Sequence, residues 1–192
     1  GYVEPNFYKN FSFTDEDFFR KISYLCYTTN NYLPCINHEP LFIQHLKDEI
    51  HNYISEDVDN CFSELVTSLE DNGYEVDSEY NGFGVELMEE KVVININGKL
   101  ILTKAEETEK KEDFKIIAPS KFYDIAIVVQ EIISQEAEYC NFDTLGFMSL
   151  HPEFKINKIS TSDLEIIYTV EHRDTEEKFL FAVRSCVIPP GI

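Results

Sequence analysis

The five cysteines are the residues whose spacing most directly predicts covalent chemistry. Cys26 and Cys35 flank a predicted turn, and a disulfide between them would close a loop of about ten residues, restricting the unfolded chain by roughly 2 to 3 kcal/mol. Cys61 lies on the apolar stripe of one predicted helix and Cys140 at the end of another, so a Cys61 to Cys140 disulfide would clamp these helices if they pack side by side. Cys186 is then left over as a small buried residue. The alternative is five reduced, buried thiols.

Metal binding is the next chemistry to consider. His38, His45 and His51 lie near the acidic residues Asp48 and Glu49 in the sequence. Their spacing lacks the paired ligands of a zinc site, and His45 falls on an apolar helical stripe, where a core role is expected. We therefore predict no metal at these residues.

Catalytic signatures are absent from the sequence. Asp15-Glu16-Asp17 could chelate a cation, but a helix start explains these acids, and no Asp-x-Asp-x-Asp-Gly loop follows. The chain has no Gly-x-Ser-x-Gly, His-Glu-x-x-His, Gly-x-x-x-x-Gly-Lys or Gly-x-Gly-x-x-Gly motif. With 36 Asp and Glu residues, a pair of acids for glycoside hydrolysis could be drawn almost anywhere. We predict no enzymatic activity and no cofactor.

Helix and strand patterns alternate along the chain. Apolar residues at spacings of three and four, Tyr53 among them, predict an amphipathic helix over 39–72, with Ser55 as a point where a second helix could begin. A second helix is predicted over 120–139, followed by a short turn or helix over 142–150. Strand patterns occupy 74–76, 83–88, 92–96, 100–103, 114–117, 154–159, 164–170 and 179–187.

Three local signals bear on how these elements connect. Asn97-Gly98 predicts a type I′ turn between two strands. The charged segment 104–113 is expected to be a loop at a sheet edge. Residues 18–26 fit either a helix or a strand, and the Thr29-Asn30-Asn31 turn favours a hairpin.

Together these elements predict a single α+β domain over 1–192. An aromatic N-terminal segment (1–38) precedes two regions, 39–118 and 119–192, that each read as a long amphipathic helix packed on an antiparallel β-meander. The similarity of the two regions is explained either by an internal duplication or by independent use of the same arrangement.

The charge distribution limits the partners of this chain. The formal charge of −20 on 192 residues excludes binding to nucleic acid or anionic lipid through phosphate contacts. No run approaches the ~20 apolar residues of a membrane span.

The acidic residues are concentrated in the two predicted helical regions. Residues 39–72 hold 9 acids and 1 base, and residues 119–151 hold 5 acids and 1 base. If both helices cover one sheet face, their outer side forms an acidic face that could bind a basic protein or a cation. The alternative is that these charges serve only to keep the protein soluble. The central residues of this face are Asp48, Glu49, Glu56, Asp57 and Asp59.

Several short segments follow one another in a recognisable order: Gly1-Tyr2-Val3-Glu4-Pro5, the helix with Cys61, Gly73-Tyr74-Glu75-Val76, the hairpin 92–104, Phe122-Tyr123-Asp124-Ile125-Ala126 and Phe179-Leu180-Phe181-Ala182. This order resembles a group of uncharacterised membrane-anchored extracytoplasmic proteins of small-genome archaea. The resemblance implies that Gly1 lies just outside a membrane anchor, and it implies no activity. An extracytoplasmic position would favour disulfides and glycosylation at Asn10, in the sequon Asn10-Phe11-Ser12.

We therefore expect an extracytoplasmic, membrane-anchored, non-enzymatic domain that acts through a protein partner or self-assembly, as a surface, adhesion or assembly subunit. Membrane contact is expected only upstream of Gly1. Aromatic residues of the N-terminal segment could anchor the partner or belong to the core: Tyr2, Phe7, Tyr8, Phe11 and Phe13. Two alternatives stay open. One is an acidic, cytosolic decoy of a nucleic-acid-binding protein with reduced cysteines, and the other is a small-ligand binder or enzyme without a known motif.

Overall fold

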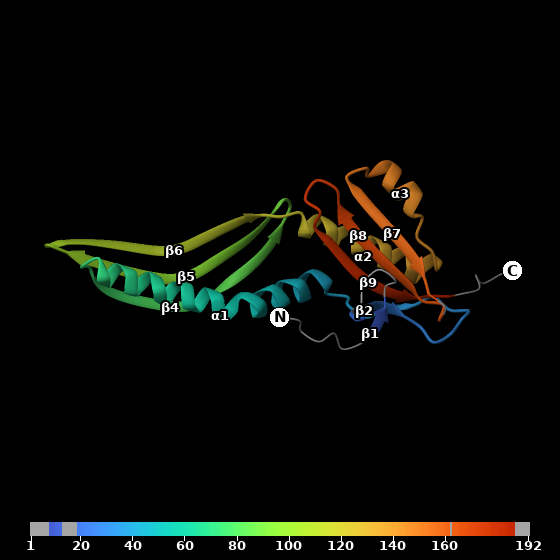
Figure 1. Cartoon of the computed structure of the whole chain (residues 1–192), viewed down its shortest axis with the longest axis horizontal. Coiled ribbons are helices and arrows are strands. Elements are labelled where there is room, and N and C mark those ends of the chain that lie inside the picture. Colours follow the sequence, from blue (N-terminus) through green and yellow to red (C-terminus); the bar gives the residue numbers. More distant parts are fainter. Residues whose placement is uncertain (1–7, 13–18, 162, 187–192) are drawn as a thin grey trace. The chain divides into compact units, whose positions relative to one another are not determined.

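The computed structural model describes residues 8–12, 19–161 and 163–186 (Figure 1). Their contacts divide the chain into two compact units. Unit 1 is the segment Gln44–Pro119, and unit 2 combines the described residues up to Ile43 with those from Ser120 onward. The single domain expected from the sequence stays a prediction, because compactness alone does not show whether two units unfold together.

Unit 1 is a helix packed on a three-stranded antiparallel sheet. The helix, α1 (Phe42–Asp71), spans 30 residues without a break at Ser55 and runs along the sheet in Figure 1. Phe62 on its apolar stripe is buried with Leu100 and Leu102 of the central strand, so the predicted amphipathic helix is confirmed. The strands are β4 (Glu75–Met88), β5 (Lys91–Lys104) and β6 (Glu107–Pro119), in the order β4-β5-β6.

Asn97-Gly98 does not form a turn, so this prediction is wrong. The dipeptide lies inside β5, and both strand pairs of the sheet shift register beside it. A Cβ added to Gly98 would lie 3.0 Å from the Phe62 ring and 3.4 Å from the Glu79 carbonyl oxygen. Glycine is therefore needed here because α1 approaches β5 closely.

The actual hairpin turns carry no glycine. Glu89-Glu90 joins β4 to β5, and Ala105-Glu106 joins β5 to β6 with positive φ at both residues, as in a type I′ turn. The charged segment 104–113 lies at a sheet edge, as expected, but it is not a loop, because most of it is the edge strand β6. Its acids and bases pair at a spacing of two residues on both faces of the strand, Lys110 with Glu112 at 2.6 Å and Lys111 with Glu109 at 2.5 Å.

Gly98→Ala should lower the free energy of unfolding by about 1 to 3 kcal/mol, because the added methyl group overlaps the Phe62 ring. Gly84→Ala is a matched control, since a Cβ there meets nothing within 4 Å, and it should stay within about 0.5 kcal/mol of the wild type. Urea denaturation followed by circular dichroism measures both. Equal stability of the two variants would show that α1 can move away from β5 freely.

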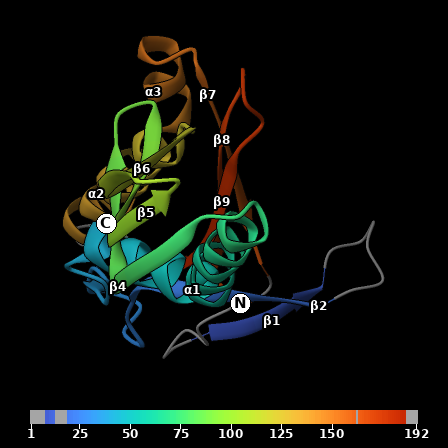
Figure 2. The same ribbon diagram turned by 90° about the vertical axis from the view of Figure 1, so that its left-hand side faces the viewer.

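Unit 2 is a mixed sheet with two helices. Its strands are β1 (Tyr8–Ser12), β2 (Phe19–Tyr27), β3 (Ile36–Asn37), β7 (Phe154–Ser160), β8 (Ile166–His172) and β9 (Lys178–Arg184). The sheet order is β1-β2-β9-β8-β7, with β3 also on β2, and the β2–β9 pair is parallel. The helices are α2 (Phe122–Tyr139) and α3 (Thr144–Leu150). Figure 2 shows β1 running beside β2. Ile132 of α2 and Phe181 of β9 are fully buried in this unit.

Several predictions for unit 2 are confirmed. β2 and β3 form the antiparallel hairpin preferred over a helix, and β7, β8 and β9 form the expected meander. In the aromatic segment Phe11 is buried, whereas Tyr8 is exposed. Some residues of this segment lie outside the described part of the chain: Tyr2, Phe7, Phe13 and Asp15-Glu16-Asp17.

The predicted architecture of two long helices on antiparallel meanders is wrong, although the chain has both helices and strands as an α+β protein does. Among the described residues α1 is the one long helix, and α2 has 18 residues. The second region does not form its sheet alone, because β2 from the N-terminal segment inserts beside β9 in parallel. This parallel pair makes the sheet of unit 2 larger than the β-meander expected from the sequence.

Candidate functional site

The acidic face predicted from the sequence is carried by α1 alone. Asp48, Glu56, Asp57 and Asp59 are exposed, and Glu49 is half-buried. The condition that two helices share one sheet face is not met, because α2 packs on β8 and β9 of unit 2, whereas α1 packs on the sheet of unit 1. The five carboxylates therefore form a stripe along a single helix.

Contacts within unit 1 already occupy three of these five carboxylates. Asp48 accepts a hydrogen bond from Gln44 (2.9 Å), Glu49 pairs with His45 (3.1 Å), and Asp59 accepts one from the Tyr80 hydroxyl (2.5 Å). Burial and the bond to Asp59 raise the pKa of Tyr80 to about 12. Within the described ranges, Glu56 and Asp57 have no side-chain partner, so they are available to another molecule.

Tyr53 completes this surface and was missed by sequence reasoning, which placed it on the buried stripe. Its side chain is 64% exposed. Glu56 and Asp57 follow it by three and four residues and therefore share its side of the helix. An exposed tyrosine beside two unpaired carboxylates can hold an arginine, whose guanidinium group stacks on the ring and pairs with the acids.

The three histidines do not come together. His45 bonds to Glu49, His51 stacks on Phe83 with ring centroids 4.3 Å apart, and His38 lies near Tyr27 in unit 2. Among the residues with described positions, no group of three His, Cys, Asp or Glu side chains could hold a metal ion.

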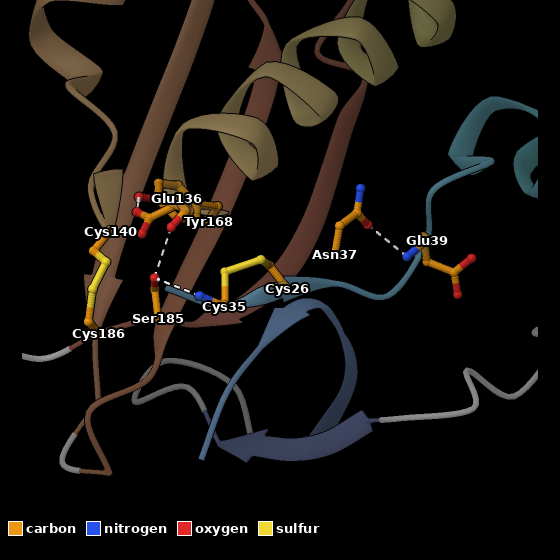
Figure 3. Close-up of a disulfide and its surroundings, with 9 residues drawn as sticks. All are labelled: Cys26, Cys35, Asn37, Glu39, Glu136, Cys140, Tyr168, Ser185 and Cys186. Carbon is orange, nitrogen blue, oxygen red and sulfur yellow. Dashed lines mark hydrogen bonds between the residues drawn. A yellow bond between two sulfur atoms is a disulfide. The ribbon is translucent and has the colours of Figure 1, made fainter. Parts of the chain in front are cut away.

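Unit 2 contains two disulfides. Cys26 bonds to Cys35 and Cys140 bonds to Cys186, with Cα–Cα distances of 5.3 and 5.5 Å (Figure 3). The predicted bond between Cys26 and Cys35 is confirmed. The predicted bond between Cys61 and Cys140 is wrong, because Cys61 belongs to unit 1, where it is an exposed free thiol. Cys186 was expected to stay unpaired and is the actual partner of Cys140.

A buried polar network connects the two disulfides (Figure 3). The Ser185 hydroxyl accepts from the Cys35 N–H (3.3 Å) and donates to the Glu136 carbonyl oxygen (2.9 Å). The fully buried Glu136 side chain accepts from the Tyr168 hydroxyl and from the Lys158 ammonium group (3.3 Å) through Oε1. Its Oε2 has no hydrogen-bond partner in the described structure. This network stabilises unit 2.

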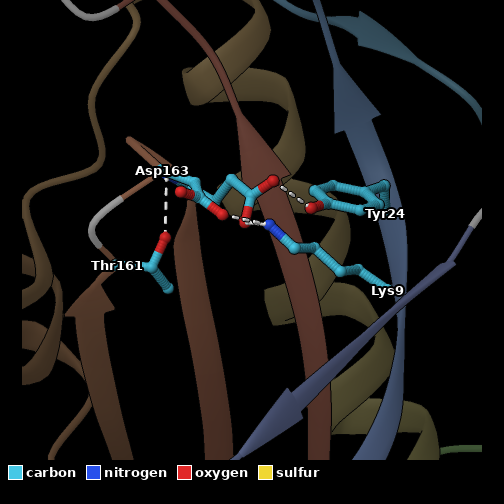
Figure 4. Close-up of polar contacts among 5 residues, drawn as sticks. Lys9, Tyr24, Thr161 and Asp163 are labelled. Carbon is cyan, nitrogen blue, oxygen red and sulfur yellow. Dashed lines mark hydrogen bonds and ion pairs between the residues drawn. The ribbon is translucent and has the colours of Figure 1, made fainter.

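A second polar cluster joins β1 to the segment before β8 (Figure 4). The Lys9 ammonium group lies 2.5 Å from Asp163 Oδ2 and 2.9 Å from Glu165 Oε2. The Tyr24 hydroxyl donates to Glu165 Oε1 at 2.5 Å. Hydrogen bonds to Asp163 and Glu165 raise the pKa of Lys9, and burial, followed by the bond to Glu165, raises that of Tyr24. No motif marks these residues, because the cluster joins opposite ends of the chain.

The chain matches no protein-family model, no curated protein and no solved structure. Its function must therefore be inferred from the geometry above. No helix within the described ranges is both long and apolar enough to cross a membrane. The two disulfides fit an oxidising, extracytoplasmic environment.

The start of α2 is held by Glu177, from the segment before β9. The Ser120 hydroxyl and the Lys121 N–H each donate to its carboxylate at 2.6 Å. Burial acts to raise the pKa of Glu177. The hydrogen bonds from Ser120, Lys121 and Thr175, together with the nearby His172, outweigh the effect of burial, so the pKa is lowered.

Glu177→Gln should destabilise the protein by about 1 kcal/mol at neutral pH, because it removes a negative charge from a helix N-terminus. A lowered pKa in the folded state means that the carboxylate stabilises the fold above its ordinary pKa of 4.5 and loses this effect as the pH falls through the lowered value. The stability difference between variant and wild type should therefore shrink in acid. Urea denaturation at neutral and acidic pH measures it, and a difference independent of pH would contradict the role of the charge.

Proposed function

We propose that this chain is a membrane-anchored, extracytoplasmic, non-enzymatic domain that acts by protein contact at the cell surface, as an adhesion or assembly subunit. The observation that supports this most directly is the outer side of α1, where Tyr53 is exposed beside Glu56 and Asp57. Tyrosine is enriched at the energetically dominant positions of interfaces, and the unpaired acids select a basic partner.

The shape of this surface favours a protein partner over a small ligand. The depression that continues along α1 is open and shallow, and it is lined by Asn60, Ser63, Glu64, Thr67, Ser68 and Asp71. Small-molecule sites bury most of their ligand in a concave, largely apolar pocket. An open groove on the surface of a helix instead fits the flat contact of another protein.

The compartment supports the same proposal. Disulfides persist in oxidising environments, so they weigh against a cytosolic decoy, which would require reduced cysteines. Asn10 is exposed on β1, where a glycan would not disturb the core. The anchor before Gly1 and the surface location follow from the resemblance to archaeal membrane-anchored proteins and are part of the proposal.

Neutralising the acidic face should abolish the contact. The test variant carries Asp48→Asn, Glu49→Gln, Glu56→Gln, Asp57→Asn and Asp59→Asn. A matched control neutralises five acids on the strands of unit 1: Glu75, Asp77, Glu79, Glu86 and Glu112. The immobilised wild-type chain should capture a basic surface protein from crosslinked cells of the source organism, the control should retain this capture, and the test variant should lose it. Equal capture by all three chains would show that the acids on α1 serve solubility alone.

A further inference from the structure

The outermost strand of unit 2, β1, is a five-residue edge strand. Within the described chain it pairs with β2 and no other strand. Phe11 is buried at 7% exposure, Lys9 forms the ion pairs described above, and Tyr8 and Asn10 are exposed. The ion pair of Lys9 with Asp163 is open to solvent and therefore weak, with exposed side-chain fractions of 38% and 63%. Such an edge element belongs to the less stable part of a fold.

The surface beneath β1 receives the side chain of Phe11. Phe11 packs on residues of β2, β8 and β9: Ile22, Tyr24, Ile167 and Ala182. Ile167 lies on the sheet face away from α2, because the next residue, Tyr168, points to Glu136 of α2. We call these four residues, together with Asp163 and Glu165, the acceptor site.

The acceptor site selects a strand by charge as well as by shape. Its apolar part receives an aromatic ring, and its acidic end receives a cation two residues earlier in the strand, as Phe11 and Lys9 show. Without this cation, the charged Glu165 side chain would stay buried, at 6% exposure, with the neutral Tyr24 hydroxyl as its hydrogen-bond donor. Leaving a buried charge short of a partner is unfavourable, so an emptied site has a strong preference for a basic strand.

We propose that the acceptor site also binds β1 of a second copy of this chain, so that two copies exchange this strand. Every copy carries the matching Lys9-Asn10-Phe11 sequence, and exchange remakes the same contacts in the partner. The binding mode is strand addition at a sheet edge, in which main-chain hydrogen bonds give affinity and alternate side chains give specificity. This inference does not depend on the acidic face of α1, which lies in the other unit.

A disulfide between copies tests the exchange directly. Asn10 and Lys21 lie opposite each other in the β1–β2 register, and both are exposed. One chain carries Asn10→Cys and the other Lys21→Cys, both with Cys61→Ser, and the two are mixed and oxidised. We expect a dimer with a bond between positions 10 and 21, identified by mass spectrometry. One chain carrying both cysteines shows that the pair can bond within a copy.

The control mixture pairs the Asn10→Cys chain with a Lys110→Cys chain, whose cysteine lies on β6 of unit 1. If β1 is exchanged, the Asn10→Cys chain should form a much higher yield of disulfide-linked dimer with the Lys21→Cys chain than with the Lys110→Cys chain. Equal yields, with the single-chain bond intact, would overturn the proposal. Because neither yield involves α1, the result is independent of the experiment on the acidic face.

Charge reversal then tests recognition by the acceptor site. Adding Lys9→Glu to the Asn10→Cys chain places a carboxylate against Asp163 and Glu165, and the yield should fall to that of the control mixture. Adding Asp163→Lys to the Lys21→Cys chain should restore it, because the opposite charges meet again between copies. An unchanged yield with Lys9→Glu, or no recovery with Asp163→Lys, would overturn recognition at this site.

Discussion

Replacing Cys140 and Cys186 together with serine should lower the free energy of unfolding by about 4 kcal/mol. Their bond joins residues 46 positions apart, and the conformational entropy that a crosslink removes from the unfolded chain grows with this separation. The bond between Cys26 and Cys35 spans 9 positions, so its loss should lower the free energy by about 2.5 kcal/mol. Urea denaturation followed by circular dichroism compares the two double variants.

Cys61→Ser is the matched control for these variants. Cys61 is exposed and unbonded, so its substitution should leave the unfolding curve unchanged. A loss for the short-loop pair as large as that for the long-loop pair would contradict the loop-length argument. Retention of wild-type stability without Cys140 and Cys186 would show that packing alone fixes the end of α2.

The two disulfides illustrate what the sequence can and cannot predict. Cys26 and Cys35 flank a local turn, so their pairing followed from neighbouring residues. The pairing of Cys140 depends on topology, because α2 packs on β9 and Cys186 follows the end of this strand. No residue pattern near Cys186 encodes this arrangement, and the choice of Cys61 failed for that reason.

Strand connections show the same limit. Asn97-Gly98 has the composition of a hairpin turn, but Gly98 serves the approach of Phe62 from α1. The actual turn, Ala105-Glu106, has residues that favour a different local conformation, so strand pairing over the full length of β5 and β6 overrides their preference. Long-range packing decides both positions, whereas the helix over 39–72 was predictable from its repeating apolar spacing.

The candidate site was predictable in part. The acids of α1 were identified from the charge distribution, but Tyr53 was assigned to the buried stripe because its spacing of three and four residues from other apolar residues fits that stripe. The buried Glu136 did leave a signal in the sequence. It follows Ile132 and Ile133 by four and three residues, so it continues the apolar stripe of α2, where a carboxylate requires a donor.

Removing this carboxylate should have the other large effect. Glu136→Ala should lower the free energy of unfolding by about 3 to 5 kcal/mol. Glu136 is fully buried and accepts hydrogen bonds from Tyr168 and Lys158. Alanine leaves the buried Tyr168 hydroxyl without this acceptor, leaves Lys158 with its bond to Asn141, and opens a cavity. Urea denaturation at neutral pH measures the loss. A loss below about 1 kcal/mol would show that water or a shifted side chain replaces the carboxylate.

Tyr168→Phe separates the hydrogen bond from the cavity and should cost about 1 to 3 kcal/mol. The double variant with Glu136→Ala should lose less stability than the sum of the two single variants, because each change removes a group that the other leaves unpaired.

The Tyr168 hydroxyl also predicts a dependence of stability on pH. Burial has the largest effect on its pKa, followed by the charge of Glu136 and the hydrogen bond between the two groups, and all three raise the pKa above its ordinary 10.0. The hydroxyl therefore stabilises the fold fully below pH 10.0 and loses this effect as the pH rises through the raised value. The wild type should lose stability above pH 10.0 more steeply than Tyr168→Phe, and equal slopes would place the Tyr168 hydroxyl outside the network.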